Sequence, residues 1–262
     1  MVAVAGNIAS CTSDQDDATA RLLADADAVF TAGDNAFPNG TARDYECFGS
    51  SWGQHRAKLY GVLGNHEYDT GSADAAFDWF GDRAGPRGLG YYSLDIGDWH
   101  IIVLNDNSNH VSWSAGSTQE QWLRADLAAN TRTCTMAIWH APAFLSSNTD
   151  GFTSRGSVRH IWQLLYNAGV DVVVNGHQHH YERMAPLDPN GQLDSARGIR
   201  QFNAGNGGES VVMPTAAIHP RSEVRSIAYG VLKLRLRAAD YDWSYAAVPG
   251  ESFTDTGTGA CH

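Results

Sequence analysis

Short apolar runs alternate with segments of helical periodicity along most of the chain. Runs of four or five mostly apolar residues are typical of buried strands, and they occupy residues 2–5, 28–31, 60–63, 135–139 and 170–174. Apolar positions at helical spacing predict helices over residues 16–23, 73–80, 117–129 and 158–167. Asp16 and Ser117 are suited to cap two of these helices, and Gly169 is suited to end the last one. Strands that alternate with helices predict an α/β sandwich rather than an all-β barrel.

The last third of the chain changes character, because strand-like segments follow one another without intervening helices. Predicted strands cover residues 197–202, 228–236 and 241–248. Residues 237–240 would turn the last two strands into a hairpin, and an earlier hairpin is predicted between residues 90–94 and 100–104. We expect the late strands to close the sandwich, so that residues 1–262 form a single domain.

The charge balance of the chain is acidic. Lysine and arginine total 18 against 29 aspartate and glutamate residues, so the formal net charge of the 262 residues is −11. Nucleic acid and anionic lipid are themselves negative, so we expect neither as a partner. No apolar run in the sequence approaches the roughly 20 residues that a membrane-spanning helix needs, and we expect no membrane association.

Four cysteines are spread widely along the chain, namely Cys11, Cys47, Cys134 and Cys261. They form no CxxC pair, which argues against a thiolate zinc site. Their even number fits two disulfides, with three pairings open, and predicts a secreted protein. Residues 1–6 enter a predicted strand without a charged or long apolar leader. Either the chain has no signal peptide, or a mature form begins here with a start methionine.

Polar residues follow the predicted strands in four short bursts. These bursts are Gly33-Asp34-Asn35, Gly64-Asn65-His66-Glu67, Trp139-His140-Ala141-Pro142 and Gly176-His177-Gln178-His179. Glycine allows close approach of backbone and side chains, and open α/β sheets bind ligands at the carboxyl ends of their strands. The pooled donors are a carboxylate, an amide and several imidazoles, which suit Zn, Mn or Fe.

Each burst taken alone has an ordinary structural interpretation. Gly33-Asp34 is common in turns, Asn65 is a common helix cap, and a lone His140 is more often a hydrogen-bonded core histidine than a ligand. The combination is different, because every burst follows an apolar strand and the last one holds two imidazoles two residues apart. It predicts a metal site. The chain contains neither a Gly-x-Ser-x-Gly elbow nor a phosphate-binding P-loop.

In this order, the bursts resemble the motifs of the calcineurin-like metallophosphoesterases. Tyr181-Glu182-Arg183, after the last burst, resembles the purple acid phosphatase branch, and the resemblance runs from Val2 to about Arg183. It implies an α/β fold of two mixed β-sheets packed as a sandwich and flanked by helices. It also implies two divalent metal ions (Zn, Mn or Fe), the first held by Asn7, Asp34 and His179 and the second by Asp34, Asn65, His140 and His177.

The same resemblance implies hydrolysis of phosphate monoesters. Two cations about 3.5–4 Å apart would bind phosphate oxygens, lower the pKa of a shared water and align the resulting hydroxide for in-line attack. Asn65 and His66 would face the substrate, and His66 would either give a proton to the departing alkoxide or stabilise its charge. The metals would also supply the positive charge that an acidic protein needs to bind a small phosphorylated substrate.

Three positions depart from the family pattern. Asn7 stands where the first motif normally has Asp, so its oxygen can coordinate but carries no charge. Asn7 is either natural to the chain or a substitution made to trap a complex. Phe37 replaces the tyrosine of the purple enzymes, so we expect no ferric–tyrosinate colour. Asn148-Thr149-Asp150 stands where those enzymes usually place substrate-facing histidines.

Two of these departures fall on the first metal. We therefore expect that ion to bind weakly, and turnover to be slow or to need high metal concentrations. Among further candidates, strand alternation should point His180 away from His179, and His219 has the pattern of an exposed loop histidine. Tyr181 and Arg183 could bind phosphate, although the position of Arg183 suits a structural ion pair equally well.

The leading prediction is a metal-dependent phosphomonoesterase. A phosphodiesterase or nucleotidase on the same metals is the alternative, and Asn7 keeps open a relative that binds a phosphorylated ligand without turning it over. Histidines clustered at strand ends disfavour a structural or adhesion role. The sequence leaves the oligomeric state open.

Overall fold

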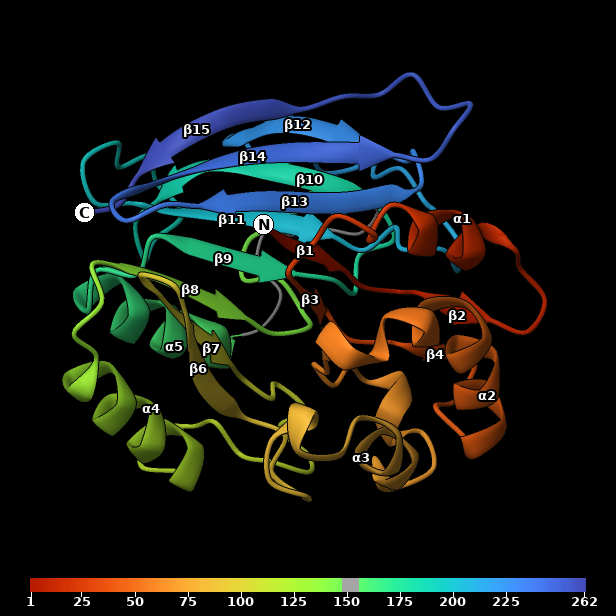
Figure 1. Cartoon of the computed structure of the whole chain (residues 1–262). Coiled ribbons are helices and arrows are strands. Elements are labelled where there is room, and N and C mark those ends of the chain that lie inside the picture. The colour runs from red at the N-terminus through yellow and green to blue at the C-terminus, as the bar shows by residue number, and fades with distance from the viewer. Residues whose placement is uncertain (148–155) are drawn as a thin grey trace.

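The computed structural model describes residues 1–147 and 156–262 (Figure 1). Its helices are α1 (Gln15–Arg21), α2 (Ala42–Ser51), α3 (Asp74–Phe80), α4 (Thr118–Ala129) and α5 (Gly156–Asn167). Short 3₁₀ helices are η1 (Trp52–Lys58), η2 (His66–Tyr68) and η3 (Gly81–Ala84). Most strands belong to two large sheets, so the fold class is α/β, as the sequence predicts.

The first sheet has six strands in the order β15 (Thr256–Ala260), β14 (Asp240–Ala247), β13 (Gly230–Leu236), β1 (Val2–Ala5), β3 (Ala28–Thr31) and β5 (Leu59–Tyr60). The second has seven, in the order β12 (Ser222–Ser226), β10 (Tyr181–Leu187), β11 (Ile199–Ala204), β9 (Val172–Asn175), β8 (Cys134–Ile138), β7 (Trp99–Val103) and β6 (Tyr92–Ile96). A two-stranded sheet joins β2 (Ala9–Ser10) to β4 (Ala36–Phe37).

Both large sheets are mixed. β1, β3 and β5 run parallel in the first sheet, and β7, β8, β9 and β11 run parallel in the second. The remaining strands pair antiparallel, and β13 with β14 forms the late hairpin that the sequence predicts. Parallel neighbours bring the loops after β1 and β3, and those after β8 and β9, to common edges.

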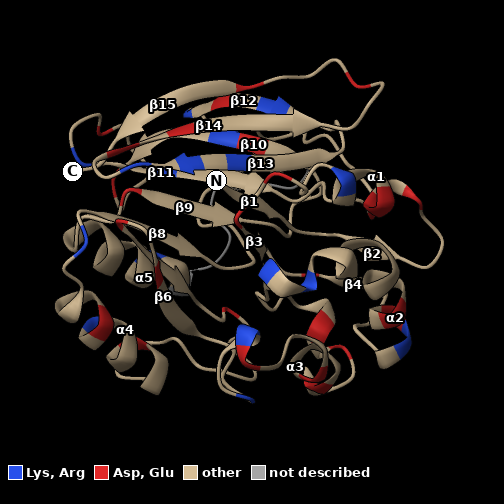
Figure 2. Cartoon of the chain, in the orientation of Figure 1, with Lys and Arg blue, Asp and Glu red and all other residues tan. Residues whose placement is uncertain are grey.

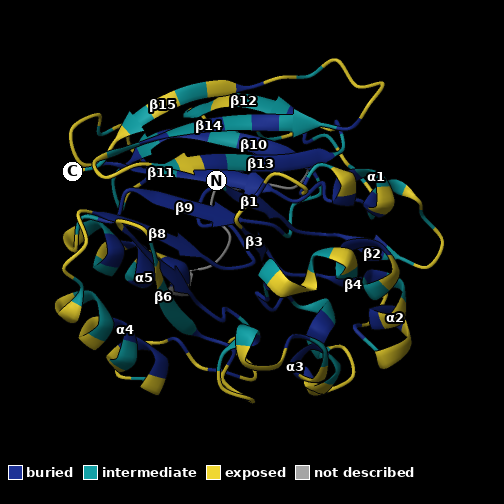
Figure 3. Ribbon diagram, viewed as in Figure 1, coloured by how far each residue is buried: buried dark blue, intermediate teal, exposed yellow. Residues whose placement is uncertain are grey.

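The hydrophobic core lies between the two sheets. Val2 and Val4 of β1 pack with Ile101 of β7, Met136 of β8 and Val174 of β9 in one buried cluster. Alternate side chains of a strand point to opposite faces, and the intervening Ala3 and Ala5 accordingly belong to a second cluster on the outer face. The central strands are therefore buried on both sides and appear dark in Figure 3.

Helices cover both outer faces. α1, α2 and α3 pack on the first sheet, where Phe48 of α2 and Phe77 of α3 join the cluster around Val29 of β3. α4 and α5 cover the second sheet, where Leu123 and Trp162 pack with Ala137 of β8. Figure 1 shows these two groups of helices on separate parts of the sandwich. The sandwich flanked by helices is thus confirmed.

Most predicted elements are present within about two residues, and three boundaries differ for local reasons. β5 ends at Tyr60, because the N–H groups of Gly61 and Val62 donate to Arg83 O and Thr31 Oγ1 instead of to a strand. β9 starts at Val172, after Val170 has donated back to helix α5. Asp16 is no N-cap: α1 starts one residue earlier, and the Asp16 carboxylate accepts a hydrogen bond from Ser51.

The structure selects one of the three possible disulfide pairings. Cys11 is bonded to Cys47, and Cys134 at the start of β8 is bonded to Cys261. Among the described residues, no helix is both long and apolar enough to cross a lipid bilayer.

Candidate metal centre

Four side chains from different loops meet where the parallel strands end. His140 follows β8 by two residues, His177 follows β9 by two, and Asp34 follows β3 by three. Asn65 comes from the loop between β5 and η2. In β8 and β9, as in β3, every strand residue is buried, so each strand is a fixed support for the polar residue beyond it.

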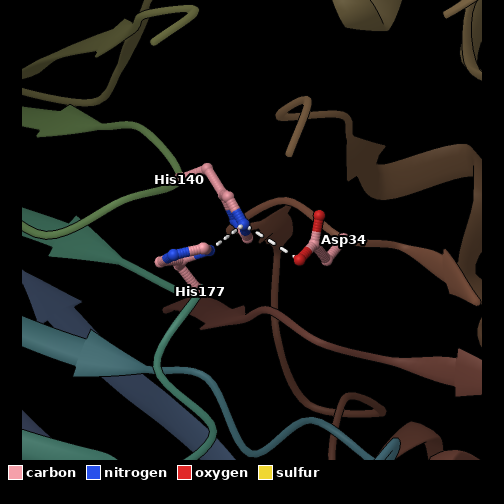
Figure 4. A group of neighbouring side chains, drawn as sticks. All are labelled: Asp34, His140 and His177. Carbon is pink, nitrogen blue, oxygen red and sulfur yellow. Dashed lines mark hydrogen bonds and ion pairs between the residues drawn. The ribbon is translucent and has the colours of Figure 1, made fainter. Parts of the chain in front are cut away.

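The ring of His140 lies between Asp34 and His177, as Figure 4 shows, and it also approaches Asn65. Its Nε2 atom lies 3.0 Å from Asp34 Oδ2, 3.2 Å from Asn65 Oδ1 and 3.2 Å from His177 Nδ1. One ligand atom from each of Asp34, His140 and His177 can be chosen so that all three lie within 4.8 Å of one another. The convergence that the sequence predicts is therefore present for these four residues.

Burial and opposite charge act against each other in this group. Asp34 and His140 are almost completely buried, which disfavours the charged form of each. Their mutual attraction outweighs burial, lowers the pKa of Asp34 to about 2 and raises the pKa of His140 to about 9. At neutral pH the imidazole of His140 is thus protonated on both nitrogens in the metal-free chain. Its positive charge takes the place that a metal cation would occupy.

The backbone at the site is held in an uncommon conformation. Asn7, Asp34 and His177 have φ angles of 56°, 54° and 64°, and they are the non-glycine residues with positive φ in the described chain. A Cβ on Gly33 would lie 2.3 Å from His140 Nδ1, and one on Gly64 would lie 2.2 Å from Asp34 Oδ1. Backbone strain of this kind persists where the surroundings fix it, and it clusters at functional sites.

Two buried carboxylates hold the site loops in place, and neither was assigned a role from the sequence. Glu67 accepts hydrogen bonds from the backbone N–H groups of Asp34, Asn35 and Gly64 at 2.7–3.0 Å. Burial and the charge of Asp34 raise the pKa of Glu67. Glu67 belongs to the second polar burst of the sequence, and its place in that burst was the signal.

Asp106, the second carboxylate, accepts from the N–H groups of His140 and Ala141. It lies three residues after β7, so a carboxylate beyond a strand end could have marked it. Glu67 and Asp106 therefore support two different sides of the centre.

His66 stands at the rim of this group, with 29% of its side chain exposed. Its Nδ1 contacts the carbonyl oxygen of Pro38, which leaves Nε2 directed inward at 3.9 Å from Asp34 Oδ2. Its ring packs against Phe37 with centroids 4.4 Å apart, and Phe37 in turn lies 5.9 Å from the ring of His179. Phe37 is therefore part of the site wall between two histidines.

Asn7 and His179 lie outside the compact group. The Asn7 Oδ1 atom accepts the N–H of His177 at 2.9 Å, and Asn7 Nδ2 approaches His177 O at 3.4 Å. His179 directs Nδ1 toward Ser210 and Glu209, away from the other candidate ligands. The side expected to bind the first metal is thus more open than the side around His140, and His179 keeps about a quarter of its side chain exposed.

The further candidates His180 and His219 make their contacts outside this group. His180 is buried beside Glu182, and His219 is also buried, with Nδ1 accepting from the Arg221 N–H, so the expectation of an exposed His219 is wrong. Residues 148–150 lie outside the described residues.

Phosphate binding by Tyr181 and Arg183 is not supported either. The Tyr181 hydroxyl and the Arg183 guanidinium both bond Asp255, and Arg183 also pairs with Glu223 of β12. Basic and acidic segments accordingly lie side by side on β10 and β12 in Figure 2. The interpretation of Arg183 as a structural ion pair is the one that the geometry supports.

The residues of the compact group fit a divalent cation. The His140 Nε2 atom has three polar neighbours at 3.0–3.2 Å, although an imidazole nitrogen makes a single in-plane hydrogen bond. A carboxylate oxygen, an amide oxygen and two imidazole nitrogens are the donor set expected for Zn, Mn or Fe. A second grouping of potential ligands among the described residues, Cys134, Asp171 and Cys261, does not fit, because its two sulfurs are bonded to each other.

Space for a ligand adjoins this group. A pocket of about 190 Å³ opens beside Asn65 and is lined by Tyr68, Asp69 and residues 107–110. A larger cavity of about 590 Å³ lies near Tyr60 and Tyr92, and its lining contains none of the converging residues. Donor chemistry rather than cavity size therefore locates the site.

Comparisons with known proteins agree with this geometry. Purple acid phosphatase 15 of Arabidopsis thaliana is 29% identical over 138 residues, which are 49% of this chain and 25% of that protein. Purple acid phosphatase 22 of the same plant is 30% identical over 165 residues, covering 58% of this chain and 36% of that protein. The chain thus spans well under half the length of these curated relatives.

Solved structures show the same fold. Purple acid phosphatase PPD1 from yellow lupin seeds matches with a TM-score of 0.84 at 20% identity, covering 99% of this chain and 53% of that one. GAP50, described as the anchor in the inner membrane complex of Plasmodium, matches with a TM-score of 0.76 at 12% identity, covering 100% and 88%. The model of the calcineurin-like phosphoesterase family matches residues 8–181, about two thirds of the chain. The chain belongs to the calcineurin-like phosphoesterase family.

Proposed function

We propose that this chain hydrolyses phosphate monoesters at a dinuclear metal centre. The observation that carries the proposal is the convergence of Asp34, Asn65 and His177 on the Nε2 atom of His140. Membership of the calcineurin-like phosphoesterase family and relatives named purple acid phosphatases support metal-dependent hydrolysis of phosphoric esters. The proposal treats residues 1–262 as one catalytic domain acting on a small phosphorylated substrate.

Asp34, Asn65, His140 and His177 would hold one ion, and Asp34, His179 and Asn7 would hold the other. Two bound cations would supply positive charge for the phosphate oxygens and lower the pKa of a water between them. Local positive charge is needed, because the chain carries a formal net charge of −11 and would otherwise repel a phosphate ester.

The chain's own residues would complete the reaction. The carbonyl oxygen of Pro38 fixes the ring of His66 so that Nε2 faces the centre. From there His66 would donate its proton to the leaving alkoxide, as a general acid at hydrogen-bond reach does. Asn65 would contact the phosphate, and the pocket beside Asn65 would accept the alcohol portion.

Turnover of chromogenic monoesters and diesters, each with added Mn or Zn, tests the proposal. Monoester turnover well above diester turnover supports it, and the reverse supports the phosphodiesterase alternative. Phosphate binding without turnover of either ester would instead favour a ligand-binding relative, which the amide at Asn7 makes a specific alternative. Anomalous scattering at the centre would give the number and identity of the metals together.

The two disulfides also bear on where the protein works. Disulfides persist in oxidising compartments, and the structure pairs all four cysteines. We therefore propose that the protein acts outside the reducing cytosol, as a secreted enzyme.

A further inference from the structure

The loop after β11 brings a carboxylate to the side of the centre where Asn7 provides none. Gly207 donates its N–H to Gly6 O at 2.9 Å, and Glu209 donates its N–H to Asn7 O at 3.0 Å. These two bonds fasten residues 207–209 along the end of β1. Glu209 is therefore held beside Asn7 by the backbone itself.

The close approach of this loop depends on its glycines. A Cβ on Gly207 would lie 2.6 Å from Gly6 O, and one on Gly208 would lie 2.5 Å from the backbone nitrogen of Asp16. Gly208 also has a φ angle of 148°, which side chains rarely tolerate. The glycines at positions 207 and 208 thus allow the close backbone approach that holds Glu209 beside Asn7.

The side chains of Glu209 and Ser210 both face His179. The Nδ1 atom of His179 lies 2.8 Å from Ser210 Oγ, 3.1 Å from Ser210 O and 3.3 Å from Glu209 Oε2, and the Ser210 hydroxyl donates to the Glu209 carboxylate. The carbonyl oxygen of His179 accepts the N–H of Val212 at 2.8 Å, so the loop holds this histidine at two points. The Nε2 atom of His179 is then the nitrogen left to meet an ion.

We infer that Glu209 is a positioning residue of the first metal site. It lies 3.3 Å from the Nδ1 atom of His179 and accepts the hydroxyl of Ser210, which Nδ1 contacts in turn. In this way it fixes the ring with Nε2 toward the ion and supplies the negative charge that Asn7 lacks. Carboxylates that hold the distal nitrogen of a ligating histidine orient the ring and raise its basicity. The inference rests on the proposed function, because it requires a first ion between Asp34, His179 and Asn7.

The direct test is calorimetric titration of the metal-free chain with Mn²⁺ and, separately, Zn²⁺. The wild type is expected to bind two ions with different affinities. Glu209→Gln keeps the shape of the side chain, and it should weaken the looser ion about 10–100-fold while changing the tighter one less than about threefold. Ser210→Ala, which leaves the carboxylate in place, should weaken the looser ion less than Glu209→Gln does.

Glu46→Gln is the matched control, because Glu46 is an exposed carboxylate on α2 whose loss changes the net charge equally. It should leave both affinities unchanged. The two substitutions Asn7→Asp and Glu209→Gln should also be non-additive, because a carboxylate at position 7 restores the charge that Glu209 would provide. Thermal unfolding of the metal-free variants checks that each is folded.

The outcomes distinguish a failure of the role inferred for Glu209 from a failure of the proposed dinuclear centre. Two ions in the wild type with unchanged affinities in Glu209→Gln overturn the role of Glu209 and leave the dinuclear centre standing. A wild type that binds no ion, or one ion only, overturns the dinuclear centre and the inference with it. If Glu209→Gln does not fold, the affinity of the Ser210→Ala variant for the more weakly bound ion is the deciding measurement. An unchanged affinity in that variant counts against the inference.

Discussion

The two ends of the seven-stranded sheet carry polar side chains of different kinds. Beyond the carboxyl ends of β8 and β9, His140 and His177 crowd together with 3.2 Å between ring nitrogens. At the amino ends of the same strands, the buried carboxylate of Asp171 accepts the N–H groups of Thr135 and His262, both at 2.8 Å. The disulfide from Cys134 closes that end.

The difference lies in whether the protein itself satisfies its polar groups. At the amino end, each oxygen of Asp171 has a donor of matched geometry, which stabilises the fold. At the carboxyl end, several polar atoms compete for one nitrogen, and the backbone carries positive φ angles at Asp34 and His177. Backbone strain of this kind clusters at ligand-binding and catalytic sites, which agrees with the metal centre that we propose here. Substitutions at the two ends should therefore separate metal uptake from stability.

Asp34→Asn should have the largest effect, because Asp34 is the proposed ligand of both ions. The amide keeps the volume of the side chain but removes the charge, so we expect loss of at least one ion and a fall in kcat/KM of about 10³-fold. Metal analysis after dialysis and monoester turnover measure both quantities. Two ions retained by the Asp34→Asn variant, with normal turnover, would contradict the assignment.

Removing the Cys134–Cys261 disulfide at the amino end should lower stability and leave metal binding unchanged. Cys134→Ala with Cys261→Ala opens a link across 127 residues, and we expect the free energy of unfolding to fall by about 2–4 kcal/mol. Metal affinity should stay unchanged, because Cys134 starts β8 whereas His140 lies beyond the other end of that strand. Urea unfolding with metal titration measures both.

The second disulfide provides the matched control for that experiment. Cys11 and Cys47 are separated by 36 residues, so opening their loop should cost about 1 kcal/mol less than opening the longer one. Loss of metal binding in the Cys134–Cys261 variant, while it remains folded, would show that the two ends are coupled.

The framework of the fold could be predicted because buried parallel strands have a clear sequence pattern. β1, β3 and β8 are runs of apolar residues, and their buried state follows from that pattern alone. The strands β10 and β12 were missed, because Glu182 and Arg225 interrupt the apolar alternation. The carboxylate of Glu182 is satisfied by the N–H and hydroxyl of Ser146, 36 positions earlier in the chain, and pattern analysis has no access to such a partner.

The site was predictable to the extent that its residues follow strands. Asp34, His140 and His177 were found from that position, and the structure brings them together. Glu209 lies within the loop after β11, five residues beyond the end of that strand, and its place depends on hydrogen bonds to residues about 200 positions earlier in the chain. Only the folded structure reveals a side chain placed in this way.

Asn7→Asp should sharpen the contrast within the centre. A carboxylate would keep the bond from the His177 N–H to the Asn7 Oδ1 position and add charge beside the first ion. We expect this ion to bind about 10–100-fold more tightly, which is about 1.4–2.8 kcal/mol, and monoester turnover to rise at low metal concentration. The number of ions held after dialysis measures the change. Two ions held tightly by the wild type would contradict the expectation that its first site is weak.

The smallest expected effect is a pH dependence of stability at the amino end. His100 of β7 lies 2.8 Å from Asp126 of α4 and 2.8 Å from Asp95 of β6, and Arg132 pairs with the outer side of Asp95. The hydrogen bond to Asp126, followed by that to Asp95, outweighs burial and raises the pKa of His100. A raised pKa in the folded state contributes stability that is complete below about pH 6.5, the ordinary value for histidine, and that fades as the pH rises through the folded value.

His100→Gln should therefore lower the free energy of unfolding by about 1 kcal/mol near pH 6 and by less near pH 9. Asp126 should account for most of the difference, because solvent screens the half-exposed Asp95. Urea unfolding of the metal-free chain at both pH values measures this difference without interference from ions at the other end. His110→Gln is the control, because that histidine contacts Tyr68 and no carboxylate pairs with it among the described residues. An equal loss at both pH values in His100→Gln would mean that packing, rather than the charged imidazole, joins α4 to the sheet.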